Sequence, residues 1–340
     1  MKYFGVFFLT MTLLVGCKKT EQVKPPESGV SIAVFIPGVM AGSAIYDMLA
    51  EGTRKAADEF SASGKRTAEV TVIEGGVNQA EWETSITTLA ASQSYDLIVT
   101  SNPSMPVIVS SVLQKFPNQK FLLLDGELAG NHSVYTFRYN QREQAYMAGY
   151  IAALVSLENS QGGAKTIGLL AAQEYPVMNN IILPGYLEGA KAVDPAFNVD
   201  FRVVGNWFDA AKGAELAAGM IRSGATVLLP IAGGAGQGAV QAAFEAGAKV
   251  VWFDTNGYAI RPGTIIGSAI LRQDKAAYEK VMLYLKGELP FGKAEVAGIA
   301  DGFIDFVEDD PLYIAAVSQA IRDKQAQLIA RLRSGDLKLD

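Results

Sequence analysis

From Val30 onward, short apolar runs alternate with longer segments that show helical periodicity. The runs are apolar at nearly every position, which is typical of strands that are buried on both faces of a parallel sheet. Strands are predicted at 30–36, 69–73, 96–100, 120–124, 134–137, 166–170, 199–204, 226–231 and 249–253. Helices are predicted at 43–60, 81–92, 107–116, 141–155, 180–192, 210–223 and 238–246. The pattern predicts an α/β protein with helices on both faces of its sheets.

The chain is long enough for two such units. It has 340 residues, and the polar, glycine-containing segment Asn159–Lys165 separates a first series of strands and helices from a second one. Composition shifts of this kind are typical of domain boundaries. We therefore expect two α/β lobes, and an amphipathic helix in the tail from Tyr313.

Composition excludes several functional classes. The 35 acidic and 29 basic side chains give a net charge of −6, so we expect no nucleic-acid partner. One Cys and one His rule out a disulfide scaffold and a His/Cys metal cluster. We expect neither a metal nor a cofactor.

The N-terminus predicts export and a lipid anchor. Lys2 precedes an apolar run that is too short to span a bilayer comfortably, and the run ends in Leu14-Val15-Gly16-Cys17. This segment resembles a bacterial lipoprotein signal. We expect residues 1–16 to be removed, Cys17 to be lipidated, and residues 17–29 to form a tether. The chain would then be a membrane-anchored lipoprotein facing the periplasm or lying on the cell surface.

Polar residues follow several of the predicted strands. They are Ser101-Asn102, Asp125, Asn206-Trp207-Phe208, Gly233-Gly234 and Asp254-Thr255-Asn256. Ligands of open parallel sheets bind outside the carboxyl ends of the strands. Two such sheets that face one another would place these residues on the walls of a cleft.

The glycine-rich segment 231–239 allows three interpretations. The glycines could let the backbone approach a ligand, or they could let a helix pack closely on its sheet. Gly234, Gly236 and Ala239, with Asp254 further on, also match a dinucleotide fingerprint. A P-loop is excluded because no Lys-Ser/Thr pair follows.

Several of the polar and aromatic residues each allow a functional and a structural interpretation. Asp254 could accept hydrogen bonds from a diol or cap a turn. Trp207-Phe208 and Tyr46 could stack on a flat ring or pack in the core. Catalysis finds little support, because His132 sits in a polar turn and no nucleophile elbow occurs. We therefore expect a binding protein and not an enzyme.

Three segments and the lipoprotein signal resemble a known family. The segments 95–126, 134–156 and 205–256 are similar to the basic membrane protein / purine nucleoside receptor family, which comprises lipid-anchored substrate-binding components of ABC transporters. The resemblance implies a type I periplasmic-binding-protein fold, with two parallel-sheet lobes joined by a hinge. It also implies an N-terminal lobe of residues 30–137 plus about 268–297, and a C-terminal lobe of 138–265 plus about 299–340.

The resemblance carries over residue by residue. It implies that Asp254 binds a ribose, that Phe208, with Trp207 beside it, stacks on the base, and that Gly233-Gly234 form a turn at the ligand. The family's first-helix motif departs here, since its Asp, Phe and Asn are replaced by Gly42, Ile45 and Tyr46. Its late Lys is replaced by Leu271.

These departures favour a larger ring, such as the isoalloxazine of riboflavin, which a branch of the family binds. We expect Tyr46 and Phe208 or Trp207 to enclose the ring, with Tyr175 and Tyr258 adding aromatic surface. We expect Asp254, Asn256 and Arg272 or Gln273 to hold hydroxyls, and Asn102 and Gln173 to contact ring edges. An ABC permease and its ATPase would be the partners. The alternatives are a purine nucleoside receptor, a nucleotide-dependent enzyme and a surface sensor lipoprotein.

Overall fold

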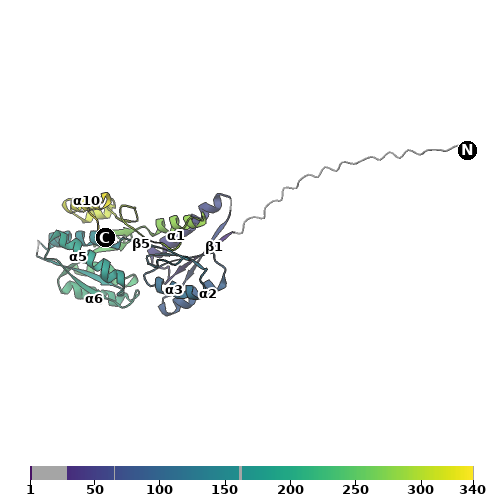
Figure 1. Cartoon of the computed structure of the whole chain (residues 1–340). Coiled ribbons are helices and arrows are strands. Elements are labelled where there is room, and N and C mark those ends of the chain that lie inside the picture. The colour runs from purple at the N-terminus through teal and green to yellow at the C-terminus, as the bar shows by residue number, and fades with distance from the viewer. Residues whose placement is uncertain (2–28, 65, 161–162, 340) are drawn as a thin grey trace.

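The computed structural model describes residues 1, 29–64, 66–160 and 163–339. Two six-stranded sheets form the framework of two α/β lobes, each with helices on both faces (Figure 1). The prediction of two lobes built on parallel sheets is confirmed. Cys17 lies outside the described residues.

The first sheet is parallel throughout and has the order β11-β5-β4-β3-β1-β2. Its strands are β1 (Val30–Ile36), β2 (Ala68–Glu74), β3 (Leu97–Ser101), β4 (Lys120–Leu124), β5 (Val134–Tyr139) and β11 (Ala294–Ala297). Helices α1 (Ala44–Ala62) and α8 (Gln273–Leu285) pack together on one face, and α2 (Trp82–Ser92) and α3 (Met105–Lys115) on the other. A short 3₁₀ turn, Gln79–Glu81, precedes α2.

The second sheet has the order β12-β10-β9-β8-β6-β7, and only β12 runs antiparallel to its neighbour. Its strands are β6 (Thr166–Ala171), β7 (Asn198–Val203), β8 (Ala225–Ile231), β9 (Lys249–Asp254), β10 (Ile265–Leu271) and β12 (Ile304–Phe306). Its helices are α4 (Gln141–Asn159), α5 (Leu183–Val193), α6 (Ala210–Arg222), α7 (Gly234–Ala246), α9 (Pro311–Ala316) and α10 (Gln319–Ser334). A π-helical turn, Met178–Ile182, leads into α5.

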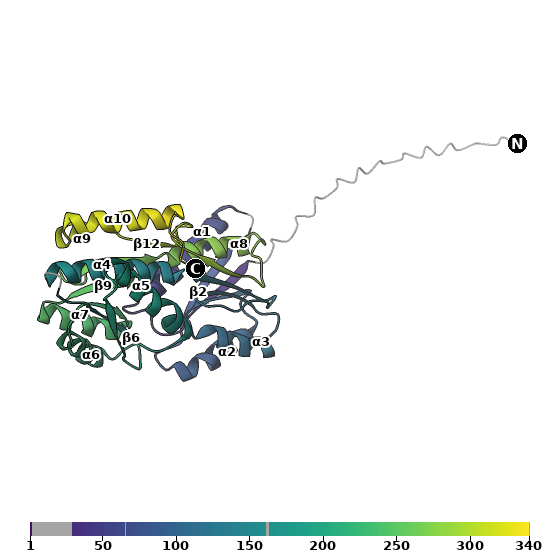
Figure 2. The same cartoon turned by 60° about the vertical axis from the view of Figure 1, so that its left-hand side comes forward.

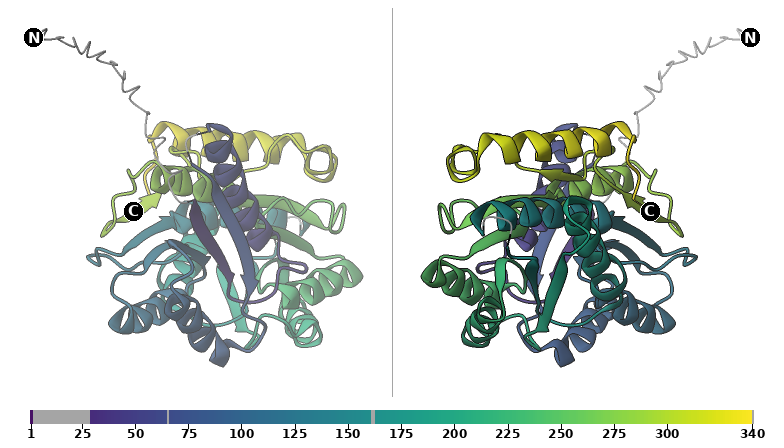
Figure 3. Two further views of the ribbon diagram at one scale, coloured as in Figure 1. Left: turned by 90° about the vertical axis from the view of Figure 1, so that its right-hand side faces the viewer. Right: turned by 90° about the vertical axis from the view of Figure 1, so that its left-hand side faces the viewer.

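The two sheets share one connectivity. Strands β1 to β5 take the same relative order as β6 to β10, with β11 or β12 added beside the last. Helices α4 and α5 pack against each other on one side of the second sheet, and α6 and α7 pair on the other. Helix α10 covers α4 at the outside of the molecule (Figures 2 and 3).

Alternation along β1 shows how the first sheet is buried on both faces. Ile32, Val34 and Ile36 belong to the large core shared with the second lobe, whereas Ala33 and Phe35 belong to a separate core under α2 and α3. Successive side chains point to opposite faces of a strand, so a sheet covered on both sides needs apolar residues at every position. This explains the unbroken apolar runs in the sequence.

The prediction that Asn159–Lys165 separates the two series is wrong. Helix α4 precedes this segment, yet it packs against α5 and β10 of the second lobe. The chain first crosses between the sheets at Asn140, whose side chain accepts a hydrogen bond from the Glu143 amide at the start of α4. The polar loop at 159–165 marks the end of helix α4, whereas the chain crosses to the second lobe before this helix begins.

Two further crossings follow, between β10 and α8 at Arg272 and between β11 and β12 in residues 298–303. Residues 268–271 belong to β10 and pair within the second sheet, which corrects their expected place in the first lobe. Residues 138–139 belong to β5 and pair with β11 in the first sheet, which corrects their expected place in the second lobe. The rest of the division into lobes remains a prediction.

Three local expectations also need correction. The tail forms two helices, α9 and α10, because Val317 is extended between them. Helix α7 begins at Gly234, so Gly234 and Gly236 lie within the helix and not in a loop before it. The apolar pattern also left β10, β11, β12 and α8 unassigned.

Candidate functional site

Two aspartates occupy equivalent positions in the two lobes. Asp125 directly follows β4, and Asp254 ends β9, the strand that corresponds to β4 in the second sheet. Their φ angles are 53° and 73°, and Gln93 is the only other described non-glycine residue with positive φ. Such conformations cost energy for residues with a side chain, and they cluster at binding sites. The carboxyl ends of the two sheets therefore present a matched pair of carboxylates.

Asp254 is held by α4. Gln144 donates its Nε2 to Asp254 Oδ1 at 3.0 Å and to the carbonyl oxygen of Ala269 at 3.0 Å. These two acceptors fix the amide orientation, and no donor in the part of the chain that the structure describes reaches the buried Gln144 Oε1. Burial raises the pKa of Asp254 to about 6, and the hydrogen bond from Gln144 opposes this rise. The Asp254 carboxylate is thus mostly ionised at neutral pH and can accept hydrogen bonds as a charged group.

Asp125 has a different environment. Its backbone amide bonds to the carbonyl oxygen of Phe137 at 2.8 Å, but in the described part of the chain its carboxyl group has no hydrogen-bond or ion-pair partner. Arg138 is nearby, and its guanidinium is paired with Glu127 at 2.9 Å. Burial and the charge of Asp254 raise the pKa of Asp125 to about 8, against the opposing effect of Arg138.

Tyr46 reaches the same region from α1. Its ring packs on Gly38, where an added Cβ would lie 3.2 Å from the ring. Its hydroxyl donates to the carbonyl oxygen of Pro37 at 2.9 Å and accepts from Asn102 Nδ2 at 3.3 Å. Burial raises the pKa of Tyr46 to about 12, so it is a neutral aromatic surface with a fixed orientation. The structure thus brings Tyr46, Asn102 and Asp125 together.

The second lobe contributes its own aromatic pair. Tyr175 and Trp207 lie with ring centroids 6.5 Å apart, and Trp207 Nε1 donates to Gln173 Oε1 at 3.1 Å. The amide groups of Gln173 and Gln79 are 3.4 Å apart, which joins the second lobe to the first. The charges of Asp125 and Asp254 both act on Tyr175, so Tyr175 lies near both carboxylates.

The glycine turn supports Trp207. Gly233 has φ 53° and approaches the Trp207 carbonyl oxygen so closely that an added Cβ would lie 3.1 Å from it. Gly234 lies against the same carbonyl group, which the Ala235 amide donates to at 3.2 Å. Phe208, in contrast, is 44% exposed. Of the two adjacent aromatics, Trp207 is the one packed beside Tyr175.

Other expected residues have protein partners. Gln273 is fully buried: its Oε1 accepts from Ser101 and Tyr139, and its Nε2 donates to the Ile45 carbonyl oxygen. Arg272 pairs with Asp274 at 3.1 Å. The roles expected of Gln273 and Arg272 in holding a ligand remain predictions.

Two more expected residues are tied to the C-terminal segments of the chain. Asn256 donates to Asp310 at 2.8 Å. Tyr258 is buried and donates to the Val307 carbonyl oxygen, so it adds no surface for a ring. A role for Asn256 at the ligand remains a prediction.

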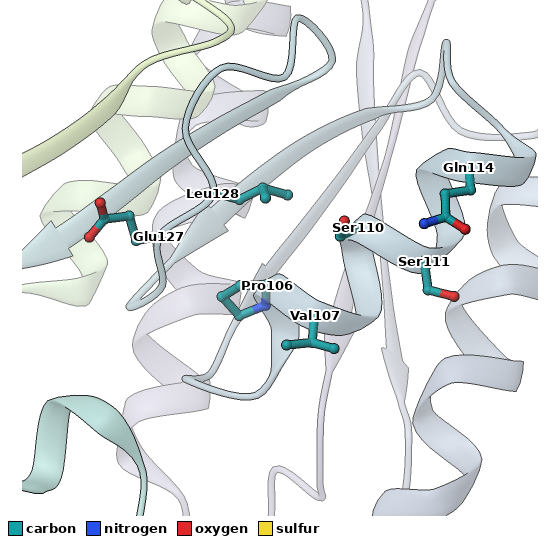
Figure 4. Close-up of a pocket in the computed structure, with 7 residues that line it drawn as sticks. All are labelled: Pro106, Val107, Ser110, Ser111, Gln114, Glu127 and Leu128. Atoms are coloured by element: carbon teal, nitrogen blue, oxygen red, sulfur yellow. The ribbon is translucent and has the colours of Figure 1, made fainter.

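Separately, a surface cavity of about 480 Å³ lies between α3 and the loop after β4, and it contains none of the expected residues (Figure 4). Among the described residues, no three or more His, Cys, Asp or Glu side chains gather to hold a metal ion. No described helix is both long and apolar enough to cross a bilayer.

Asp125 and Gln144 are not among the ligand-binding residues that the sequence predicts. Asp125 was visible as a polar residue after a strand. Gln144 gave no signal, because it lies within a helix and reaches Asp254 only through the fold.

The model of one family matches residues 29–338; it is described as "Bmp: ABC transporter substrate-binding protein PnrA-like". The chain belongs to the Bmp family. The expected relationship to basic membrane proteins and nucleoside receptors is therefore confirmed, while a place in a riboflavin-binding branch is not tested.

Two relatives cover part of this Bmp-family chain. An ABC transporter nucleoside-binding protein of Lactococcus lactis is 31% identical over 149 residues, which is 44% of this chain and 40% of the relative. A purine-binding protein of Brucella abortus is 33% identical over 161 residues, 47% of this chain and 43% of the relative. The matched region thus spans less than half the length of these relatives.

A solved structure supports the fold. An ABC transporter solute-binding protein from Aeropyrum pernix superimposes with a TM-score of 0.79 at 21% identity, covering 92% of this chain and 93% of that one. The type I periplasmic-binding-protein fold is therefore confirmed. The family and the fold are those of solute-binding proteins.

Proposed function

We propose that this Bmp-family protein captures a nucleoside for an ABC importer and releases it chemically unchanged. The observation that carries the proposal is the pairing of aromatic and acidic groups at the facing strand ends. Tyr46 and Trp207 offer flat surfaces from the two lobes, and Asp125 and Asp254 offer carboxyl groups from equivalent positions. The printed names of the two relatives support the same ligand class.

The chemistry fits a base linked to a ribose. A base has two π-faces for stacking between aromatic rings, and stacking on one aromatic side chain contributes about 1–3 kcal/mol. A ribose presents hydroxyl donors to the charged acceptor Asp254, whose Oδ1 is fixed by Gln144. Hinge closure of two lobes would remove the ligand from water.

Riboflavin is the second candidate, because the sequence replaces the family's Asp, Phe and Asn by Gly42, Ile45 and Tyr46. Both ligands combine a flat ring with hydroxyl groups. Their absorbance distinguishes them, since only a flavin absorbs blue light.

The test is to denature the purified protein, record the absorbance of any released compound, and titrate the refolded protein with adenosine, guanosine and riboflavin by calorimetry. We expect adenosine or guanosine to bind and Asp254→Ala to weaken binding by about 1–3 kcal/mol, because ligand hydroxyls lose a charged acceptor. Glu215→Gln, on the outer surface of α6, is the matched control. Unchanged affinity in Asp254→Ala would remove Asp254 from the site, and turnover of the ligand or of NAD would overturn the binding function.

The partners and location belong to the same proposal. A permease and an ATPase would receive the ligand, and a lipid on Cys17 would hold the protein at the membrane. Metabolic labelling with a radioactive fatty acid tests the anchor: Cys17→Ser should abolish the label. Labelling that persists in Cys17→Ser would contradict it.

A further inference from the structure

The two carboxyl groups of the site differ in what surrounds them, although their positions are equivalent. Asp254 accepts a hydrogen bond from Gln144, which favours its ionised form. Asp125 accepts none within the described chain, and Arg138, the cation whose charge acts on it, is paired with Glu127. Two carboxylates that share a partly buried site repel each other, so a proton is retained by the one with less support. The surroundings therefore favour a proton on Asp125 and not on Asp254.

Of the described groups that face Asp125, only Arg138 carries a positive charge, and it is paired with Glu127. These groups come from β9, β5, α1 and the segment after β6, and they are Asp254, Arg138, Tyr46, Tyr139 and Tyr175. The tyrosines stay neutral, because burial raises the pKa of Tyr46 to about 12 and the pKa values of Tyr139 and Tyr175 well above their usual range. Two of them already use their hydroxyl protons: Tyr46 donates to Pro37 and Tyr139 to Gln273.

The site also has more acceptors than donors. Gln144 Oε1 is fully buried beside Asp254 and has no donor among the described residues. Strand β10 (Ile265–Leu271) contains no basic residue, so no ammonium group enters from this strand. A proton on Asp125 reduces this excess and converts one acceptor into a donor.

We propose that Asp125 binds the ligand as a neutral carboxylic acid, so that the site presents one donor, Asp125, and one charged acceptor, Asp254. This inference rests on the proposed nucleoside function and deepens it. It assigns the ligand an acceptor atom, a ring nitrogen or carbonyl oxygen, at the end that meets Asp125, and hydroxyl donors at the end that meets Asp254.

The test is the pH dependence of adenosine affinity, because adenosine itself does not titrate between pH 6 and pH 9. Asp125 titrates near pH 8 and loses the required proton above it, so wild-type affinity should fall about tenfold from pH 7 to pH 9. Asp254 titrates near pH 6 and loses the required charge below it, so affinity should also fall toward pH 5.

Substitutions separate the two limbs of this profile. Asp125→Asn keeps a donor that does not titrate, so it should retain affinity at pH 7 within about threefold and lose the alkaline limb only. Asp125→Ala should weaken binding at every pH. Thermal unfolding and circular dichroism establish that each variant is folded. Infrared spectroscopy supplies an independent readout: the carboxylic-acid C=O band of the complex at pH 7 should be absent in Asp125→Asn.

Each outcome is decisive. Adenosine binding that is constant from pH 7 to pH 9, or equal losses in the Asn and Ala variants, would overturn the donor role of Asp125 and leave the nucleoside function intact. Failure of any nucleoside to bind at any pH would overturn both.

Discussion

Asp125 and Asp254 adopt a left-handed backbone conformation that most residues with a side chain avoid. Aspartate tolerates it better than most residues do, because its short polar side chain can form local hydrogen bonds. The conformation turns the chain immediately after an apolar strand. It places each carboxyl group at the sheet end and away from the core.

Substitutions of Tyr46 test whether its ring stacks on the ligand. Tyr46→Phe keeps the ring but loses its hydrogen bonds to Pro37 and Asn102, and we expect adenosine affinity to change by less than about fivefold. Tyr46→Ala removes the ring and should weaken binding by about 1–3 kcal/mol. Calorimetric titration of both variants checks this. Equal losses in Phe and Ala variants would assign the effect to the hydroxyl group.

The sequence allows some residues of the candidate site to be predicted and hides others. Asp254, Asn102 and Trp207 follow strands, so the rule that ligands meet strand ends is enough to find them. Gln173 also follows a strand, and its contact with Gln79 of the other lobe needs the assembled fold. The opposite surroundings of Asp125 and Asp254 depend on Gln144 and Arg138, which no local pattern reveals.

At the scale of elements, α6 and α7 approach closely through glycine. An added Cβ at Gly238 would lie 1.8 Å from the Ala210 carbonyl oxygen, whereas at Gly236 the nearest atom would be at 3.6 Å. The glycine-rich segment therefore serves close helix packing at Gly238 and the Trp207 turn at Gly233.

We expect Gly238→Ala to lower the free energy of unfolding by about 1–3 kcal/mol, because backbone atoms must move apart. Gly236→Ala, in the same helix, should be neutral or raise it by up to about 1 kcal/mol, since alanine favours helix. Urea unfolding of both variants measures the difference. A destabilised Gly236→Ala with an unaffected Gly238→Ala would contradict the packing in the structure.

Elements were predictable where the apolar pattern was strong. Strands β1, β3, β4 and β9 are continuous apolar runs and were placed within a residue or two. Strands β11 and β12 have four and three residues, which is too short for a periodicity to show. The sequence predicts a domain boundary at the end of α4, because a polar loop alone does not show which sheet a helix covers.

At the scale of the whole molecule, ligand and stability are linked. A ligand that contacts both lobes and binds only the folded chain stabilises it by RT ln(1 + [L]/Kd), about 2.7 kcal/mol at 100 times Kd. We expect adenosine at that concentration to raise the melting temperature by a few degrees. Asp254→Ala at the same adenosine concentration should show a smaller shift. Differential scanning calorimetry checks it, and an unchanged melting temperature despite calorimetric binding would contradict this linkage.

The shared connectivity of the two sheets bears on how a ligand is oriented. A molecule lying between Asp125 and Asp254 meets an aspartate at each end, as it would on a twofold axis. The placement of the backbone alone would therefore allow the molecule to bind in either orientation. Arg138 at one end and Gln144 at the other break that equivalence. These two neighbours would then decide which end of a bound ligand meets Asp125 and which end meets Asp254. Exchanging the two types of side chain should reverse the orientation of the ligand without altering the fold.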